Sequence, residues 1–275
     1  MTLHVFADVE QGSEDWHALR RGIVTASTVG KLVTVGSPDA LAVGCPTCSA
    51  EVASPCMSLV AKKAPTPIKT IHPARTQAAS ELPPVYSVAT DETAASLTAT
   101  LVAERITDHT EATPITSDMW RGIDSEPYAR DVYSGFYQQA VECGFMIREE
   151  PGWRLGYSPD GLVGDDGLIE IKAPRAKTQV CTVLSDEIPA QHMAQLQGGL
   201  LVSGRKWIDF VSFNGGMHMY VKRVLPDPAW HEAIIAAATR FEATAAEMVA
   251  AYQQATKNMP ATERIPDLYS AELKL

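Results

Sequence analysis

A chain of 275 residues, 45% hydrophobic and 20% charged, has the composition of a globular protein that can bury a sizeable core. Its formal net charge of −10 argues against a protein that coats DNA through basic residues, although acidic groups that bind divalent cations contribute to such a total. Residues 1–10 contain no basic segment and no sustained apolar run, and no stretch reaches the roughly 18 apolar residues of a membrane span. We therefore expect a cytoplasmic protein without membrane contact.

The first predicted elements are two short helices within residues 11–33, joined by a basic turn. Ser13 is the expected N-cap of the first helix and Ser27 that of the second. Residues 34–88 then change in character, because Pro, Ser, Thr, Ala and Cys dominate and the apolar periodicity fades. We interpret this segment as an insertion into a domain made of residues 1–33 and 89–256, with a polar tail over 257–275.

Regular structure is expected again after the insertion. A helix is predicted over 91–107 and another over 118–142, with an interruption near its start at Gly122 and Pro127. The strand-like segments are 144–148, 153–157, 161–163, 168–172, 206–213 and 217–224. Helices are expected over 189–202 and from Asp227 to about residue 254. This order predicts an α/β or α+β fold with a mixed sheet between helices.

The segment with the clearest chemistry runs from residue 158 to 172. Asp165, Asp166 and Gly167 form a turn signal that predicts a hairpin. Because alternate side chains of a strand share a face, Glu170 and Lys172 point one way and the intervening isoleucines point into the core. Asp160 precedes the partner strand of the same hairpin, and we expect it to reach the face that carries Glu170.

Two carboxylates close together repel one another unless a cation lies between them. Oxygen ligands favour Mg²⁺ or Mn²⁺, and such an ion activates water and stabilises charge on a phosphate. Lys172 is then expected to position the water or to neutralise developing negative charge, with a pKa lowered by burial. The alternative is a surface hairpin in which Glu170 and Lys172 form a weak ion pair.

Five blocks of sequence occur in an order and spacing that resemble the lambda exonuclease family, also called YqaJ-type viral recombinases, within the PD-(D/E)xK nucleases. The blocks are residues 16–27, 120–130, 158–161, 170–172 and 193–197. They span residues 11–33 and about 90–225. The resemblance implies a restriction-endonuclease-like core, in which helices flank a central mixed sheet.

The resemblance also implies roles for individual residues. Asp160 and Glu170 match the metal-binding carboxylates, with the backbone carbonyl of Ile171 as a further ligand, and Lys172 matches the catalytic lysine. Glu126 matches a further acidic residue beside the site.

Three other positions match residues around the active site of this family. Gln195 matches a glutamine of the active-site wall, and Arg20 and Ser27 match residues that bind a 5′ phosphate. Arg20 is alternatively a solvated helix-end charge, and Gln195 a polar helix residue. His192 falls where the family often has an aromatic residue, and it receives no role.

A cysteine cluster in the insertion has the spacing C-x₂-C-x₇-C-x₁₅-H, formed by Cys45, Cys48, Cys56 and His72. Three thiolates and one imidazole form a closed tetrahedral Zn²⁺ site, whose metal would supply folding energy to a segment poor in apolar residues. The segment resembles zinc-binding modules of phage and actinobacterial proteins. Free cysteines and an iron–sulfur cluster are the alternatives, although Cys143 and Cys181 are too isolated to support a cluster.

Basic residues lie around this cluster, and we expect them either to touch DNA phosphates or to form a solvated loop. They are Lys62, Lys63, Lys69, His72 and Arg75.

The resemblance as a whole implies an exonuclease that degrades linear double-stranded DNA from its ends, 5′→3′, in phage recombination. It implies two Mg²⁺ (or Mn²⁺) ions, a ring-shaped homotrimer and a single-strand annealing protein as partner, and the cysteine cluster adds one Zn²⁺. Two alternatives stay open: a RecB-like nuclease of other polarity, and a non-catalytic DNA-binding module in which only the zinc segment matters.

Overall fold

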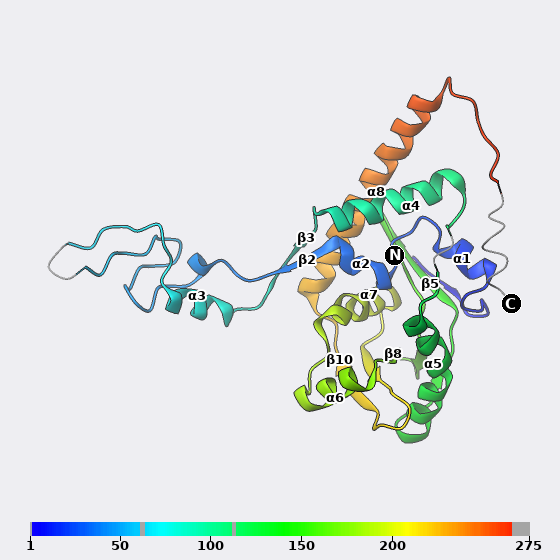
Figure 1. The fold of residues 1–275 in the computed structure, drawn as a ribbon, viewed down its shortest axis with the longest axis horizontal. Coiled ribbons are helices and arrows are strands. Elements are labelled where there is room, and N and C mark those ends of the chain that lie inside the picture. Colours follow the sequence, from blue (N-terminus) through cyan, green and yellow to red (C-terminus); the bar gives the residue numbers. More distant parts are fainter. Residues whose placement is uncertain (1, 61–63, 112–113, 266–275) are drawn as a thin grey trace. The chain divides into compact units, whose positions relative to one another are not determined.

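The computed structural model describes residues 2–60, 64–111 and 114–265 (Figure 1). The chain forms two compact units, one from Met1–Leu32 with Val88–Leu275 and the other from Val33–Ser87. Within the described residues, no helix is both long and apolar enough to cross a membrane.

The centre of the larger unit is a five-stranded mixed sheet in the order β10-β9-β8-β7-β4. Its strands are β4 (Ala140–Val141), β7 (Gly161–Val163), β8 (Gly167–Lys172), β9 (Trp207–Ser212) and β10 (Tyr220–Val224). Only the β8–β9 pair is parallel; the other pairs are antiparallel. Both predicted hairpins are present, and the helices α6 (Ala176–Ser185) and α7 (Met193–Ser203) lie between β8 and β9 in the chain.

Strand β8 is buried on both faces. Ile169 and Ile171 pack on one face with Ala129 and Tyr133 of α5 (Ser117–Phe136). Glu170, on the opposite face, is only 1% exposed. The predicted alternation is therefore confirmed, and the alternative of a surface hairpin is wrong because this strand lies in the middle of the sheet.

Helix α5 is continuous, so the predicted interruption near its start is wrong, as is its predicted end at residue 142. Thr116 caps it by accepting the backbone N–H of Met119, and Pro127 lies inside the helix. An internal proline removes one helical hydrogen bond. Burial of Ala129 and Tyr133, which follow that proline, stabilises the helix on the sheet despite this loss.

A second, three-stranded antiparallel sheet has the order β1-β5-β6. Its strands are β1 (Thr2–Phe6), β5 (Phe145–Glu150) and β6 (Trp153–Tyr157), of which β1 was not predicted. The remaining helices of the unit are α1 (Glu14–Arg20), α2 (Ala26–Val29), α4 (Glu92–Thr107) and α8 (Pro228–Thr256). In Figure 1, α4 crosses beside α8, and the two helices are in contact.

Of the N-caps predicted for the two N-terminal helices, that of α1 is confirmed and that of α2 is wrong. Ser13 caps α1 as predicted, by accepting the N–H of Trp16. Ser27 is not the cap of α2, because Thr25 occupies that position and its N–H donates to the hydroxyl of Thr28. Ser27 is the second residue of the helix, and its hydroxyl contacts that of Thr25.

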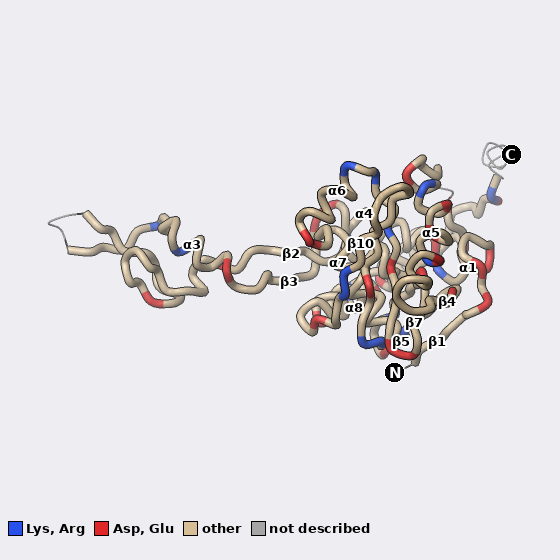
Figure 2. The backbone as a smooth tube through the Cα atoms, turned by 90° about the horizontal axis from the view of Figure 1, so that it is seen from below, with Lys and Arg blue, Asp and Glu red and all other residues tan. Residues whose placement is uncertain are grey.

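The smaller unit has little regular structure. It contains β2 (Val33–Gly36), the 3₁₀ helix η2 (Ala40–Ala42) and α3 (Pro73–Ser80), and β2 pairs with β3 (Val85–Val88). Its buried centre consists of Cys45, Ala50 and Cys56, so the cysteines form the core. Few of its described residues carry charge (Figure 2). Lys62 and Lys63 lie outside the described residues.

Hydrogen bonds to the buried carboxylate of Asp209 attach α5 to the sheet. The hydroxyl of Tyr133 donates to Asp209 at 2.7 Å, and Arg223 donates to both oxygens of the same carboxylate. We predict that Tyr133→Phe lowers the free energy of unfolding by about 1.5–3 kcal/mol, because a hydrogen bond to a buried charge is lost. Urea denaturation measures the change. Tyr137→Phe on the exposed neighbouring ring is the matched control, and equal effects would contradict the role of the hydroxyl.

Candidate active site and metal centre

Asp160 lies immediately before β7 and is only 8% exposed. Its Oδ2 accepts the backbone N–H of Ile171 at 2.6 Å, so the hairpin itself fixes the carboxylate beside β8. Its Oδ1 accepts no hydrogen bond from the described residues. One oxygen is therefore anchored while the other is left to take a different ligand.

Glu170 is held by three side chains from three elements. Its Oε1 accepts from Lys172 Nζ at 2.7 Å and from Gln195 Nε2 of α7 at 2.5 Å. Its Oε2 accepts the hydroxyl of Tyr157, at the end of β6, at 3.1 Å. The structure thus brings Asp160, Glu170, Lys172 and Gln195 together.

The electrostatics of this cluster are dominated by excess negative charge. Burial, then the charges of Glu170 and Glu126, raise the pKa of Asp160 well above its ordinary value. Burial pushes the pKa of Lys172 down as expected, but Glu170 and Asp160 outweigh it, so this pKa is raised. A divalent cation would relieve the repulsion between the buried carboxylates.

Glu126, on α5, is connected to the site by Arg130, which contacts both Glu126 and Asp160. Arg130 Nη2 lies 2.5 Å from Glu126 Oε1, while its Nε donates to the backbone carbonyl of Asp160 at 2.8 Å. Burial raises the pKa of Glu126, Arg130 opposes this shift and Glu170 adds to it. Glu126 is therefore electrostatically part of the cluster, although its hydrogen bond in this structure is to Arg130.

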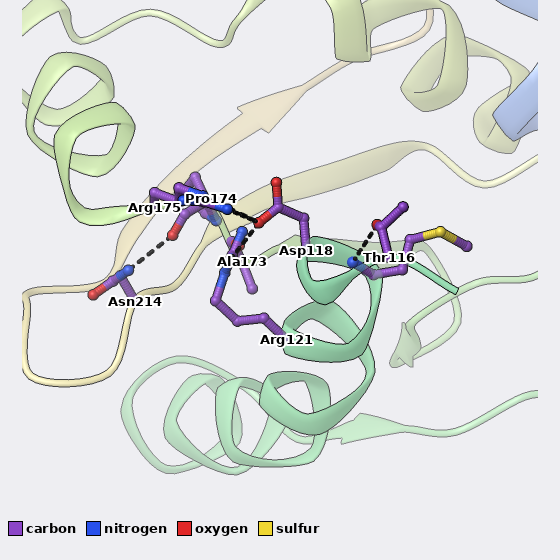
Figure 3. A network of polar contacts seen from close by, with 8 residues as sticks. Thr116, Asp118, Arg121, Ala173, Pro174, Arg175 and Asn214 are labelled. Carbon is purple, nitrogen blue, oxygen red and sulfur yellow. Dashed lines mark hydrogen bonds and ion pairs between the residues drawn. The ribbon is translucent and has the colours of Figure 1, made fainter. Parts of the chain in front are cut away.

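The loop that follows β8 is fastened on two sides (Figure 3). Arg121 of α5 donates to the carbonyl of Ala173 at 3.0 Å and pairs with Asp118 at 2.7 Å. Asn214, after β9, donates to the carbonyl of Pro174 at 2.8 Å. These contacts fix the backbone directly after Lys172 to both neighbouring elements.

The two residues expected at a phosphate site also lie close together. Arg20 Nη2 is 3.5 Å from Ser27 Oγ, and its guanidinium lies 4.1 Å from the centroid of the Trp16 ring. Burial, opposed by Glu104, lowers the pKa of Arg20 to about 10, so the group is charged at neutral pH. The indole of Trp16 donates to Ser158, two residues before the aspartate of the carboxylate cluster, at 3.1 Å.

Three residues around the site received no role from the sequence. Tyr157 gave no local signal, because its contact with Glu170 is tertiary. Arg130 lies four residues after Glu126, a spacing that places both on one helix face and would have predicted the pair. His192 stacks on Phe210 with ring centroids 5.5 Å apart, and burial, then Lys172, lower its pKa to about 4. The imidazole of His192 is thus neutral at pH 7.

The cysteine cluster of the smaller unit also comes together. The ligand atoms of Cys45, Cys48, Cys56 and His72 all lie within 4.8 Å of one another, and no other such His/Cys/Asp/Glu group occurs among the described residues. Cys45 Sγ is 3.4 Å from His72 Nδ1. This donor set, drawn around one centre, fits a tetrahedral zinc ion.

For Arg75, both expected alternatives, contact with DNA phosphates and a place in a solvated loop, are wrong. Its side chain is 0% exposed, and its guanidinium donates to backbone carbonyls inside the unit. Its place in the basic stretch of sequence gave no sign of this burial. Lys69 is exposed.

Two known protein families match parts of this chain. The YqaJ-like viral recombinase domain matches residues 70–206, which include Glu126 and the cluster from Asp160 to Gln195. A second family, described as "Putative DNA-binding phage zinc finger domain", matches residues 12–93, which include the cysteine cluster. The chain therefore carries a YqaJ-like viral recombinase domain together with a phage zinc-binding domain. No curated protein matches the chain.

Two solved structures of one enzyme agree with this fold. An alkaline exonuclease (LHK-Exo) from Laribacter hongkongensis has a TM-score of 0.62 and 24% identity, covering 90% of this chain and 100% of its own. The same enzyme in complex with dAMP has a TM-score of 0.61 at the same identity and coverage. A phage-related exonuclease from Haemophilus somnus has a TM-score of 0.43 and 13% identity, covering 84% and 98%. The likeness to LHK-Exo confirms the predicted restriction-endonuclease-like fold.

Zinc content tests the cysteine cluster directly. We predict one zinc ion per purified chain, and loss of that zinc in Cys45→Ser, because a buried thiolate ligand is removed. Elemental analysis of the protein after dialysis gives the ratio. Cys181→Ser changes an exposed cysteine outside the cluster and should retain the metal; a Cys45→Ser protein with full zinc would refute the ligand set.

Proposed function

We propose that this protein is a phage-type DNA exonuclease that hydrolyses phosphodiester bonds with divalent metal ions. The observation that carries the proposal is the buried cluster of Asp160, Glu170 and Lys172 at the centre of the sheet. Lys172 supplies one positive charge against the two carboxylates, so negative charge is in excess, and oxygen donors of this kind favour Mg²⁺ or Mn²⁺. The YqaJ-like domain and the fold shared with an alkaline exonuclease support the same conclusion.

The roles of the residues follow from their contacts. Asp160 and Glu170 would hold the metal, with the carbonyl of Ile171 as a further ligand. The bound ion supplies an activated water and stabilises charge on the phosphate. Lys172, already within 2.7 Å of Glu170, is placed to orient that water or to neutralise the developing charge. Gln195 and Tyr157 hold the two oxygens of Glu170 in position.

We further propose linear duplex DNA as the substrate and 5′→3′ degradation as the direction. The proximity of Arg20 and Ser27, linked through Trp16 to the carboxylate cluster, supports recognition of a 5′ phosphate. Crystallisation of the related LHK-Exo with dAMP agrees with release of mononucleotides. Resemblance to the lambda exonuclease family supports two Mg²⁺ ions, a homotrimer, a single-strand annealing partner and action in the host cytoplasm.

Removal of the lysine tests the catalytic assignment. We predict that Lys172→Ala slows Mg²⁺-dependent digestion of end-labelled linear duplex by about 10²-fold or more, because charge developing at the phosphate loses its stabilising group. Lys206→Ala is the matched control, since that lysine is exposed and pairs with Asp166. Equal digestion by wild type and Lys172→Ala would eliminate the assignment.

The phosphate site has a separate test. Wild type should digest 5′-phosphorylated ends faster than unphosphorylated ends, and Arg20→Met should reduce this preference about tenfold or more, because a charge-assisted contact is lost. Arg21→Met, which removes a neighbouring arginine paired with Asp108, serves as control. If the phosphate makes no difference to the wild-type rate, Arg20 and Ser27 do not form this site.

A further inference from the structure

Arg75 is a fully buried arginine in the zinc-binding unit. Its Nε donates to the carbonyl of Val43 at 2.9 Å, its Nη1 to that of Ser54 at 2.7 Å, and its Nη2 to that of Glu51 at 2.9 Å. The same Nη1 lies 3.6 Å from the sulfur of Cys56. One guanidinium thus ties together the backbone on both sides of the Cys45–Cys48 turn and touches a metal ligand.

A buried guanidinium destabilises a protein unless a negative charge lies nearby. Within the described chain, the hydrogen bonds of Arg75 go to carbonyls and a thiol and none goes to a carboxylate. The negative charge must therefore come from elsewhere. Three thiolates and a neutral imidazole around one Zn²⁺ leave a net charge of minus one, which is the charge that Arg75 would balance.

We propose that Arg75 is a positioning residue of the zinc centre, providing the counterion of an anionic Cys₃His site and fixing the loop that carries its cysteines. The proposal rests on the proposed zinc site and not on the nuclease activity. It also gives a reason for the donor set, because a centre with two histidines would be neutral and would leave the buried arginine without a partner.

The local structure couples this arginine to the fourth ligand. His72 is the N-cap residue of α3, and the backbone N–H of Arg75 donates to its carbonyl at 2.9 Å. Ligand and counterion therefore occupy the same helical turn.

An arginine suits this place better than a lysine. A planar guanidinium donates in several fixed directions at once, whereas an ammonium concentrates its charge at one point. Three carbonyls from separate positions and a sulfur surround the group here. Lysine would retain the charge but lose most of the loop contacts.

The test uses the full chain with Co²⁺ in place of zinc, and release of zinc to a competing chelator. Arg75→Met should bind metal about 10- to 100-fold more weakly, as removal of an outer-sphere partner commonly does. Its sulfur-to-cobalt charge-transfer band should move to longer wavelength, because the Cys56 sulfur loses a hydrogen-bond donor and a positive charge. Arg75→Lys should lie between this variant and wild type.

Lys69→Met is the matched control, because it removes one positive charge from an exposed position of the same unit. It should leave affinity and spectrum unchanged. Wild-type affinity together with an unshifted band in Arg75→Met would overturn the proposal.

If Arg75→Met does not fold around the metal, the same measurements on Arg75→Lys test the proposal. Faster zinc release than wild type supports the proposal, and wild-type release with a wild-type cobalt spectrum contradicts it. Absence of stoichiometric zinc from the wild-type protein would refute the zinc site itself, and with it the role proposed for Arg75.

Discussion

The larger unit depends on two carboxylates that are buried close together at one hairpin, with Glu170 on β8 and Asp160 immediately before β7. Asp160 and Glu170 repel one another in a place that excludes most water. Each carboxylate is nevertheless held by donors that come with the fold: the amide of Ile171 for one, and three side chains for the other. The side chains are thus held in place by the fold itself, and the proposed divalent cation would supply the missing positive charge.

Helices α7 and α5 hold further side chains against this carboxylate cluster. Helix α7 brings Gln195 to Glu170, and it approaches β6 closely at Gly199, where an added Cβ would lie 2.8 Å from the ring of Tyr157. Helix α5 brings Glu126 and is fastened by Tyr133 to Asp209. The smaller unit differs, because two of the three residues in its buried centre, Cys45 and Cys56, belong to the proposed zinc site.

Local patterns were sufficient to predict much of the fold and part of the site. The period of two in β8 correctly placed Glu170 and Lys172 opposite the core isoleucines, and turn residues predicted both hairpins. The predictions failed where tertiary contacts, and not the local sequence, determine the structure. Pro127 does not interrupt α5 because packing outweighs one lost hydrogen bond, and the contact of Tyr157 with Glu170 has no signature in the sequence. Arg75 was expected at the surface because sequence alone does not distinguish a solvated arginine from a buried one.

Binding of Mn²⁺, followed by electron paramagnetic resonance on zinc-loaded protein without DNA, tests the central claim most directly. The claim is that the buried carboxylate pair forms a divalent-cation site. Wild type should bind Mn²⁺, and Asp160→Asn should lose this binding while gaining stability in the absence of metal, because the repulsion with Glu170 is relieved. Unchanged Mn²⁺ affinity in Asp160→Asn would contradict the account.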